Sequence, residues 1–287
     1  MTLALQLAVQ GLLMGGIYGL IAVGLSLIFG VMGVLNFAHG PMMVMGMYIS
    51  YWLLTHLGLD PYLSFLLVAG LTFVIGYVIQ SAMVNRILDF PEAMQVLPLV
   101  ALGLIIENSL LLWWGPDPRS PQTALGLATL HIGPIMIDVS RLMAFILAIA
   151  ITGAIFLFLK KSDLGKSIRA AADNRLGAIL VGIKVNRVNN ISFALGAATT
   201  GAAGALLLPL MSLSPHLGHD FTMTAFVVVI LGGLGNLGGA LAGGFVLGLA
   251  ESLSTLFIPA SMKQLVSFGL LVLIMLFRPQ GLFGGKR

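Results

Sequence analysis

One glycine-rich stretch decides how this chain can fold: Leu231-Gly-Gly-Leu-Gly-Asn-Leu-Gly-Gly-Ala240. It interrupts an apolar run from 221 to 253 and places five glycines within eight residues. Each glycine inside a helix costs about 0.8–1 kcal/mol relative to alanine, which disfavours one straight helix here. The stretch therefore predicts a re-entrant hairpin, two short helices of roughly 12 to 15 residues joined by a turn near 232–239.

The composition is that of a polytopic membrane protein. Of 287 residues, 59% are hydrophobic and only 8% are charged, and the mean hydropathy is +1.06, whereas a soluble domain has roughly 25% charged residues. We expect one all-α transmembrane helix bundle over residues 1–287. A crossing needs about 20 apolar residues, which predicts about eight hydrophobic segments, at 3–29, 34–57, 62–86, 96–114, 141–159, 191–213, 221–253 and 263–277.

Half of the positive charge lies in one loop. Seven of the 14 Lys and Arg residues fall between Lys160 and Arg187. Lys and Arg collect in cytoplasmic loops, so we expect the 160–190 loop and the 278–287 tail inside the cell and the N-terminus outside. Both ends of the 221–253 stretch then lie outside, which requires the hairpin on independent grounds. Since these loops explain the net charge of +4, no nucleic-acid partner is expected.

The same loop has features of a folded segment. Ser162 can cap the start of a helix, with Asp163 well placed in its first turn. Charged and small residues follow at helical spacing, and Gly177-Ala-Ile-Leu-Val-Gly182 then gives a small apolar tip. A helix of this kind suits docking into a groove on another protein. The alternative is a solvated loop that only sets the topology.

Polar residues within apolar spans are candidates for a transport pathway, because they are unfavourable in lipid unless they face the bundle interior or water. The candidates are Asn36, His39, Glu107, Asn108 and Asn236. Structural roles, such as capping a helix, bonding between helices or forming a turn, remain alternatives for each.

An enzymatic function has little support. Gly233-x-Gly235-x-x-Gly238 lacks the preceding strand and the following acid of a dinucleotide fingerprint, and Gly165-Lys-Ser167 lacks the first glycine of a P-loop. The sequence contains no His/Glu spacing suited to a metal and no plausible nucleophile–base pair. We expect no catalytic residue, no metal site and no cofactor bound by this chain.

Several strings together resemble one family, the inner-membrane permeases of branched-chain amino acid ABC importers, of the LivH type. The strings are Gly33-Val-Leu-Asn-Phe-Ala-His-Gly40, Asp163-Leu-Gly-Lys-x-x-Arg-Ala-x-Ala172, Leu180-Val-Gly-Ile183, Gly248-Leu-Ala-Glu-Ser252 and Arg278-Pro-x-Gly-Leu-Phe-Gly284. The sequence departs from the family at two positions. It has Pro41 where relatives often carry Glu, and Glu107 where they often carry Gln, so the resemblance does not decide which solute is transported.

The resemblance implies that the basic 160–190 loop couples the chain to a cytoplasmic ATPase. The coupling residues it implies are Asp163, Gly165, Lys166, Arg169, Ala171, Asn174, Ala178, Leu180 and Gly182. It also implies a second permease subunit, two ABC ATPases that carry ATP and Mg²⁺, and a periplasmic solute-binding protein. A related permease for urea, short amides or other amino acids is the alternative within this class, and a secondary transporter or channel is the alternative outside it.

Overall fold

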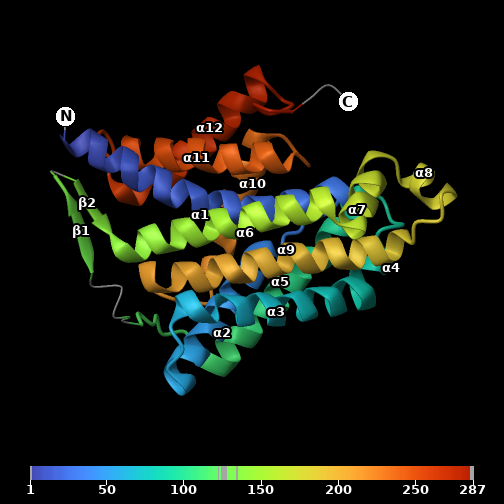
Figure 1. The fold of residues 1–287 in the computed structure, drawn as a ribbon, viewed down its shortest axis with the longest axis horizontal. Helices are drawn as coiled ribbons and strands as arrows, with labels where there is room; N and C mark the ends of the chain where they lie inside the picture. Colours follow the sequence, from blue (N-terminus) through green and yellow to red (C-terminus); the bar gives the residue numbers. More distant parts are fainter. Residues whose placement is uncertain (1, 122, 124–127, 134, 285–287) are drawn as a thin grey trace.

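The computed structural model describes residues 2–121, 123, 128–133 and 135–284 (Figure 1). The longer helices are α1 Thr2–Met32, α2 His39–Leu57, α3 Pro61–Ile79, α5 Glu92–Trp114, α6 Val139–Lys161, α9 Val185–Leu207, α10 Leu217–Gly232, α11 Leu237–Ser254 and α12 Lys263–Phe277. The shorter elements are the π-helical turn Gln80–Val84, α4 Asn85–Ile87, α7 Asp163–Asp173, α8 Arg175–Leu180, and the 3₁₀ turns Leu208–Leu210 and Ala260–Met262. Strands β1 Thr129–Ile132 and β2 Ile135–Asp138 form an antiparallel pair that the sequence did not predict.

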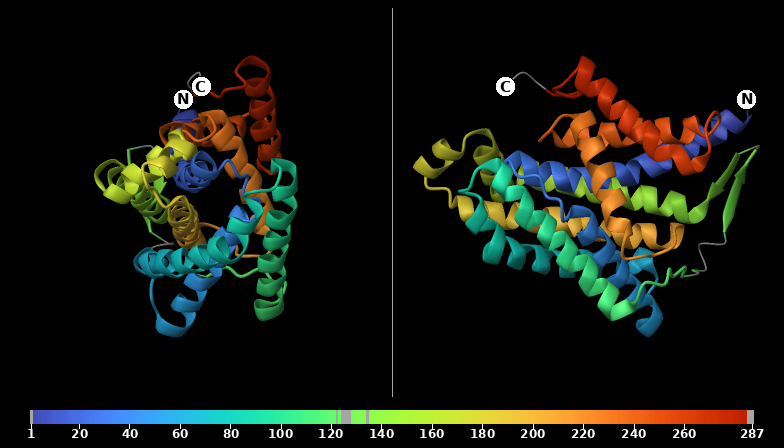
Figure 2. Two further views of the ribbon diagram at one scale, coloured as in Figure 1. Left: turned by 90° about the vertical axis from the view of Figure 1, so that its right-hand side faces the viewer. Right: turned by 180° about the vertical axis from the view of Figure 1, so that it is seen from behind.

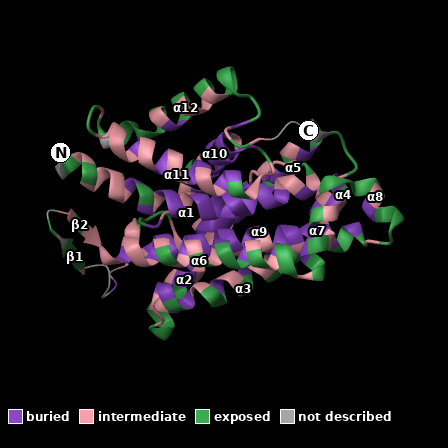
Figure 3. Ribbon diagram, turned by 45° about the horizontal axis from the view of Figure 1, so that its top comes forward, coloured by how far each residue is buried: buried purple, intermediate pink, exposed green. Residues whose placement is uncertain are grey.

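The all-α membrane bundle is confirmed. Six of the described helices are long and apolar enough to cross a membrane, and α10 and α12 are shorter apolar helices. Helices α1 and α9 form the centre, where most of their residues are buried by the helices around them (Figure 3). The chain is therefore a multi-pass membrane protein whose buried core surrounds α1 and α9.

Helices α1 and α11 pack antiparallel through small residues. A side chain added at Gly11 would lie 2.6 Å from the Gly248 oxygen, and one added at Gly15 would lie 2.8 Å from the Gly244 oxygen. Glycines at a spacing of four let two backbones come this close. The contact fixes α11, the second arm of the hairpin, along the central helix.

The second span differs from its prediction at its start. The helix begins at His39 rather than near 34, because residues 33–38 leave α1 as a non-helical segment that turns back into the bundle (Figure 2). The His39 ring reaches the carbonyl of Ile21 on α1, 2.9 Å away. Since Ile21 precedes the end of α1 by eleven residues, or about 16 Å of helix, α2 starts deep in the bundle and not at its end.

The hairpin predicted from the glycine-rich stretch is present. Gly233 and Gly235 have φ angles of +99° and +79°, a conformation that residues other than glycine rarely adopt. The two arms, α10 and α11, have 16 and 18 residues and are longer than predicted. The tail after α12 lies over the turn, where the Leu282 amide donates to the Leu231 carbonyl.

The bundle has two distinct ends (Figures 1 and 2). The N-terminus and strands β1 and β2 lie at one end, called here the β end. Helices α7 and α8 lie at the other, called the α7 end, where Gly30 of α1 and Gly235 of the hairpin turn also meet α7 around one cavity.

Candidate functional site

Helix α7 is a short helix that turns back against the end of α6. The Ser162 hydroxyl accepts the Gly165 amide at 2.9 Å, as predicted for the cap. A side chain at Gly165 would lie 2.5 Å from the carbonyl oxygens of Phe158 and Leu159, so only glycine permits this close return. The Lys166 ammonium donates to Asp163 at 2.9 Å and thereby lowers the pKa of that carboxyl. The sequence at 162–166 thus specifies both the start of α7 and its contact with α6.

One face of α7 is anchored to the bundle. Gly165, Ile168 and Ala171 are buried at helical spacing, and the Arg169 guanidinium donates a hydrogen bond to the Leu159 carbonyl at the end of α6. The opposite face, with Asp163 and Lys166, is exposed. Helix α7 is thus an amphipathic helix seated on the α7 end rather than a free loop.

Helix α8 extends this segment outward. The Asn174 side chain caps it by accepting the Gly177 amide at 2.8 Å, and Ala178 is buried. Gly182 ends it with a φ of +84°. The exposed apolar side chains here are Leu176, Ile179, Leu180 and Val181, with Leu180 86% exposed. We call these four residues the α8 tip; together they make an apolar surface outside the long apolar helices.

Helix α7 also faces the hairpin turn. A cavity of about 210 Å³ lies between the end of α1, α7 and the turn, with Gly30, Ile168, Arg169 and Gly235 among its lining residues. A displacement of α7 would therefore act on the last turn of α1 and on the hairpin at once.

Asn36 and His39 are fully buried at the start of α2. The Asn36 side chain accepts the Ala38 amide at 3.1 Å. The His39 Nε2 lies 2.9 Å from both the Ile21 carbonyl and the Thr200 hydroxyl. These bonds hold the non-helical segment between α1 and α9, and a pathway role for either residue stays a prediction.

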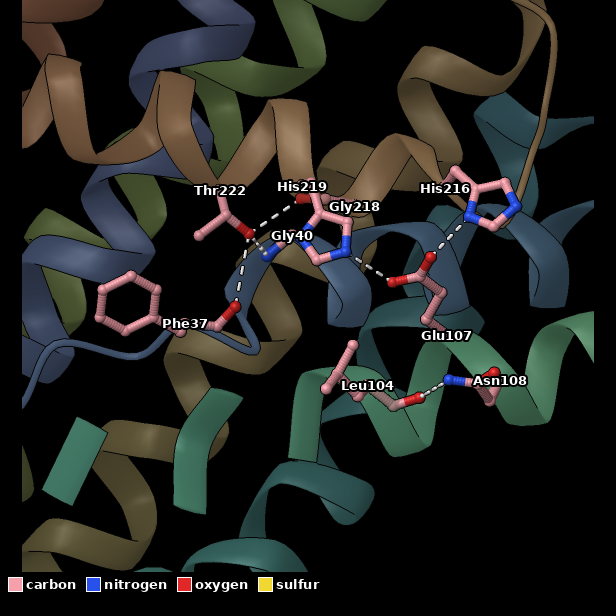
Figure 4. A network of polar contacts seen from close by, with 9 residues as sticks. All are labelled: Phe37, Gly40, Leu104, Glu107, Asn108, His216, Gly218, His219 and Thr222. Carbon is pink, nitrogen blue, oxygen red and sulfur yellow. Dashed lines mark hydrogen bonds and ion pairs between the residues drawn. The ribbon is translucent and has the colours of Figure 1, made fainter. Parts of the chain in front are cut away.

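Glu107 lies between two histidines (Figure 4). It comes from the middle of α5, and its carboxylate oxygens are 2.6 Å from His216 Nδ1 and 2.8 Å from His219 Nε2. The Glu107 side chain is 9% exposed, whereas those of His216 and His219 are 66% and 60% exposed. The carboxylate is thus paired, as its position within a span demands, and its partners face outward from the chain.

The start of α10 is held beside this group by close backbone packing. Thr222 accepts the Gly40 amide at 3.0 Å and donates to the Gly218 carbonyl at 2.8 Å (Figure 4). A side chain at Gly40 would lie 1.9 Å from the Gly218 oxygen. Helices α2, α5 and α10 therefore converge where Glu107 meets the histidines.

The two other asparagines have different surroundings. Asn108 is exposed next to Glu107, and its amide donates to the Leu104 carbonyl of its own helix. Asn236 caps α11 by accepting the Gly239 amide, and it donates to the Phe283 carbonyl of the tail at 2.8 Å. Asn236 thus closes the hairpin turn, far along the bundle from Glu107.

The sequence matches the family model described as the permease component of the branched-chain amino acid transport system, over residues 7–275. The chain belongs to this permease family. It is 32% identical to the high-affinity branched-chain amino acid permease LivH of Escherichia coli K12 and 29% identical to BraD of Pseudomonas aeruginosa. Each alignment covers 98% of this chain and 95% of the relative. It also matches LivM of Salmonella typhimurium, at 27% identity over 93% of this chain and 67% of that one.

In this permease, sequence analysis missed the partners of Glu107. His216 and His219 both lie in the 214–220 segment, which was interpreted as an outer loop. Nothing local linked them to a carboxylate that precedes His216 by 109 residues. Their spacing of three residues at a helix start was the available signal. No group of three or more His, Asp or Glu side chains within the described ranges has the geometry to hold a metal ion.

Proposed function

We propose that this permease imports branched-chain or related apolar amino acids and is driven by ATP hydrolysed on separate subunits. The support for the solute is the family and the names of LivH and BraD, relatives aligned over almost the whole chain. ATP and Mg²⁺ belong to the ATPase subunits, and this chain binds neither.

The observation that carries the proposal is the segment formed by α7 and α8. Its inner face is fixed to α6 by Gly165 and Arg169, and its outer tip exposes Leu180 and Val181. An apolar tip on a well-anchored amphipathic helix fits a groove on a partner protein. The resemblance of this segment to the family's coupling loop supports a cytoplasmic ATPase as the proposed partner.

Anchoring and exposure divide the coupling residues into two sets. Asp163, Lys166, Leu180 and Gly182 are exposed, which suits contact with the ATPase. Gly165, Arg169, Ala171, Asn174 and Ala178 hold the segment in shape. ATPase movement would pass through α7 to the end of α1 and the hairpin turn, which share its cavity.

The pathway is proposed along the face of α5 and α10 that carries Glu107, Asn108, His216 and His219. Polar and ionisable side chains exposed on membrane helices face water or another protein rather than lipid. A second permease subunit packed on this face would supply the missing wall. In Salmonella typhimurium, LivH and LivM are both named permease proteins of the high-affinity branched-chain amino acid transport system, which supports a heterodimer. With one coupling segment per chain, two permeases serve two ATPases.

The orientation follows from charge. The seven Lys and Arg residues of 160–187 gather at the α7 end, which is placed in the cytoplasm by the positive-inside rule. The chain then resides in the bacterial inner membrane with its N-terminus outside and its C-terminus inside. A periplasmic solute-binding protein would deliver the amino acid to the β end.

Co-purification with the cognate ATPase tests the proposal. We expect the tagged wild-type chain to retain the ATPase and Leu180→Glu to lose it. Phe257→Gln is the matched control, because Phe257 is 88% exposed but lies away from α8, just after α11. Retention of the ATPase by Leu180→Glu, together with unchanged ATP-dependent leucine uptake, would refute the coupling role of this segment.

A further inference from the structure

A second polar group lies at the β end, apart from Glu107. A cavity of about 170 Å³ opens between α1, α6, α11 and the start of α12. Its polar lining includes Gln10, Tyr18, Arg141, Glu251 and Lys263, and its apolar lining includes Met14, Leu210 and Met211. Drug-sized ligands occupy about 300–1,000 Å³, so this cavity suits only a small solute.

The carboxylate in this cavity is held in place by hydrogen bonds but keeps free acceptor positions. Glu251 is 8% exposed. The Tyr18 hydroxyl donates to its Oε2 at 3.0 Å, and the Ser267 hydroxyl donates to its Oε1. An ionised carboxylate accepts at about four positions, and the two neutral donors fill only two of them. Glu251 can therefore accept further hydrogen bonds from a cationic group in the cavity.

The two cations in the lining are only partly paired. Arg141 Nε is buried without a hydrogen-bond partner among the described residues. Its nearest carboxylate oxygen, on Asp138, is 3.7 Å from Nη2. Lys263 interacts electrostatically with Glu251 but forms no ion pair within 4 Å in the described part of the chain. Arg141 thus keeps an unpartnered Nε beside its long contact with Asp138, and Lys263 has no close ion pair, so both cations can bind an anionic group in the cavity.

We propose that this cavity binds a free α-amino acid as a zwitterion. The carboxylate of the solute would pair with Arg141 and Lys263, since a guanidinium fork binds carboxylates in a bidentate manner. Its ammonium would bond to Glu251, and Met14, Leu210 and Met211 would contact an aliphatic side chain. The choice of an amino acid as the solute rests on the proposed function. The requirement that the solute carry both a positive and a negative group rests on the cavity alone.

Leucine binding to the full-length permease in phosphatidylcholine nanodiscs tests this proposal. We expect Lys263→Gln and Arg141→Gln each to weaken binding at least about tenfold, the loss that follows about 1.4 kcal/mol of lost interaction. Lys263 is exposed, so Lys263→Gln should fold normally. Lys184→Gln removes an equal charge at the α7 end and should leave binding unchanged. 4-Methylpentanoate, which lacks the ammonium, should compete poorly.

Two results would overturn the proposal. In the first, leucine binds with equal affinity to wild type and to the Arg141→Gln/Lys263→Gln double variant. In the second, phosphatidylethanolamine in the nanodisc displaces leucine, which would assign the cavity to a lipid head group. Either result is separable from failure of the proposed function, because ATPase co-purification and ATP-driven uptake do not depend on where leucine binds.

Discussion

Replacing Gly244 by alanine tests whether close backbone packing between α1 and α11 holds this bundle together. The added methyl group would lie 2.4 Å from the Gly19 nitrogen and 2.6 Å from the Gly15 oxygen. Both neighbours are backbone atoms that cannot move aside by changing rotamer. To restore ordinary contact distances, the two helices must separate by about 1 Å, which forfeits a quarter to a half of the dispersion energy at each contact.

Two opposing effects determine how Gly244→Ala changes the free energy of unfolding. Overpacking of this kind destabilises by about 1–3 kcal/mol, and the higher helix propensity of alanine returns up to about 1 kcal/mol. We therefore expect Gly244→Ala to lower the free energy of unfolding by about 1–2 kcal/mol. Gly153→Ala on α6 is the matched control, because no atom lies within 4 Å of its added methyl group; it should be neutral or slightly stabilising.

Unfolding of the purified permease in mixed micelles, followed by tryptophan fluorescence as the fraction of denaturing detergent rises, measures both variants. The midpoint for Gly244→Ala should lie below that of wild type, and the midpoint for Gly153→Ala should not. If the two variants unfold together, the packing of α1 on α11 does not limit stability, and the account of this contact is wrong.

Three further outcomes are expected. Glu107→Gln removes the carboxylate that His216 and His219 contact and should slow leucine uptake several-fold. Ser109→Ala on the same helix should not, and equal uptake rates in the two variants would remove Glu107 from the pathway. Arg169→Gln should weaken the attachment of α7 to the bundle by about 1 kcal/mol and speed proteolysis near 160–184. Lys166→Gln removes only an exposed ion pair and should have little effect. Equal cleavage of the two variants would argue against Arg169 as the anchor. His131→Cys should react with an impermeant thiol reagent only from outside the cell, and labelling only from inside would reverse the topology.

The architecture could be predicted where local chemistry decides it. Five glycines in eight residues disfavour one continuous helix, so the hairpin could be predicted from propensity and charge, although only Gly233 and Gly235 lie in the break itself. The cap at Ser162 and the first turn of α7 were likewise local, since Ser162 bonds to an amide three residues on. These features need no knowledge of distant residues.

The features that sequence analysis missed depend on distant neighbours. Residues 33–38 have the apolar composition of a helix, yet the Asn36 side chain accepts the Ala38 amide within a non-helical segment, and His39 bonds to a carbonyl on α1. These contacts outweigh local propensity. The pairing of Glu107 with His216 and of Tyr18 with Glu251 joins residues 109 and 233 positions apart, and no spacing rule links such positions.

Cross-linking at the α8 tip tests the central claim most directly. The chain contains no cysteine, so Leu180→Cys and Phe257→Cys each introduce one unique thiol. In membranes that contain the cognate ATPase, a short bifunctional thiol reagent should join the Leu180→Cys chain to the ATPase, and the yield should change when ATP binds. The Phe257→Cys chain should give no such product. Absence of an ATPase adduct from Leu180→Cys, in membranes where ATP-driven uptake is intact, would contradict the assignment of α7 and α8 as the coupling segment.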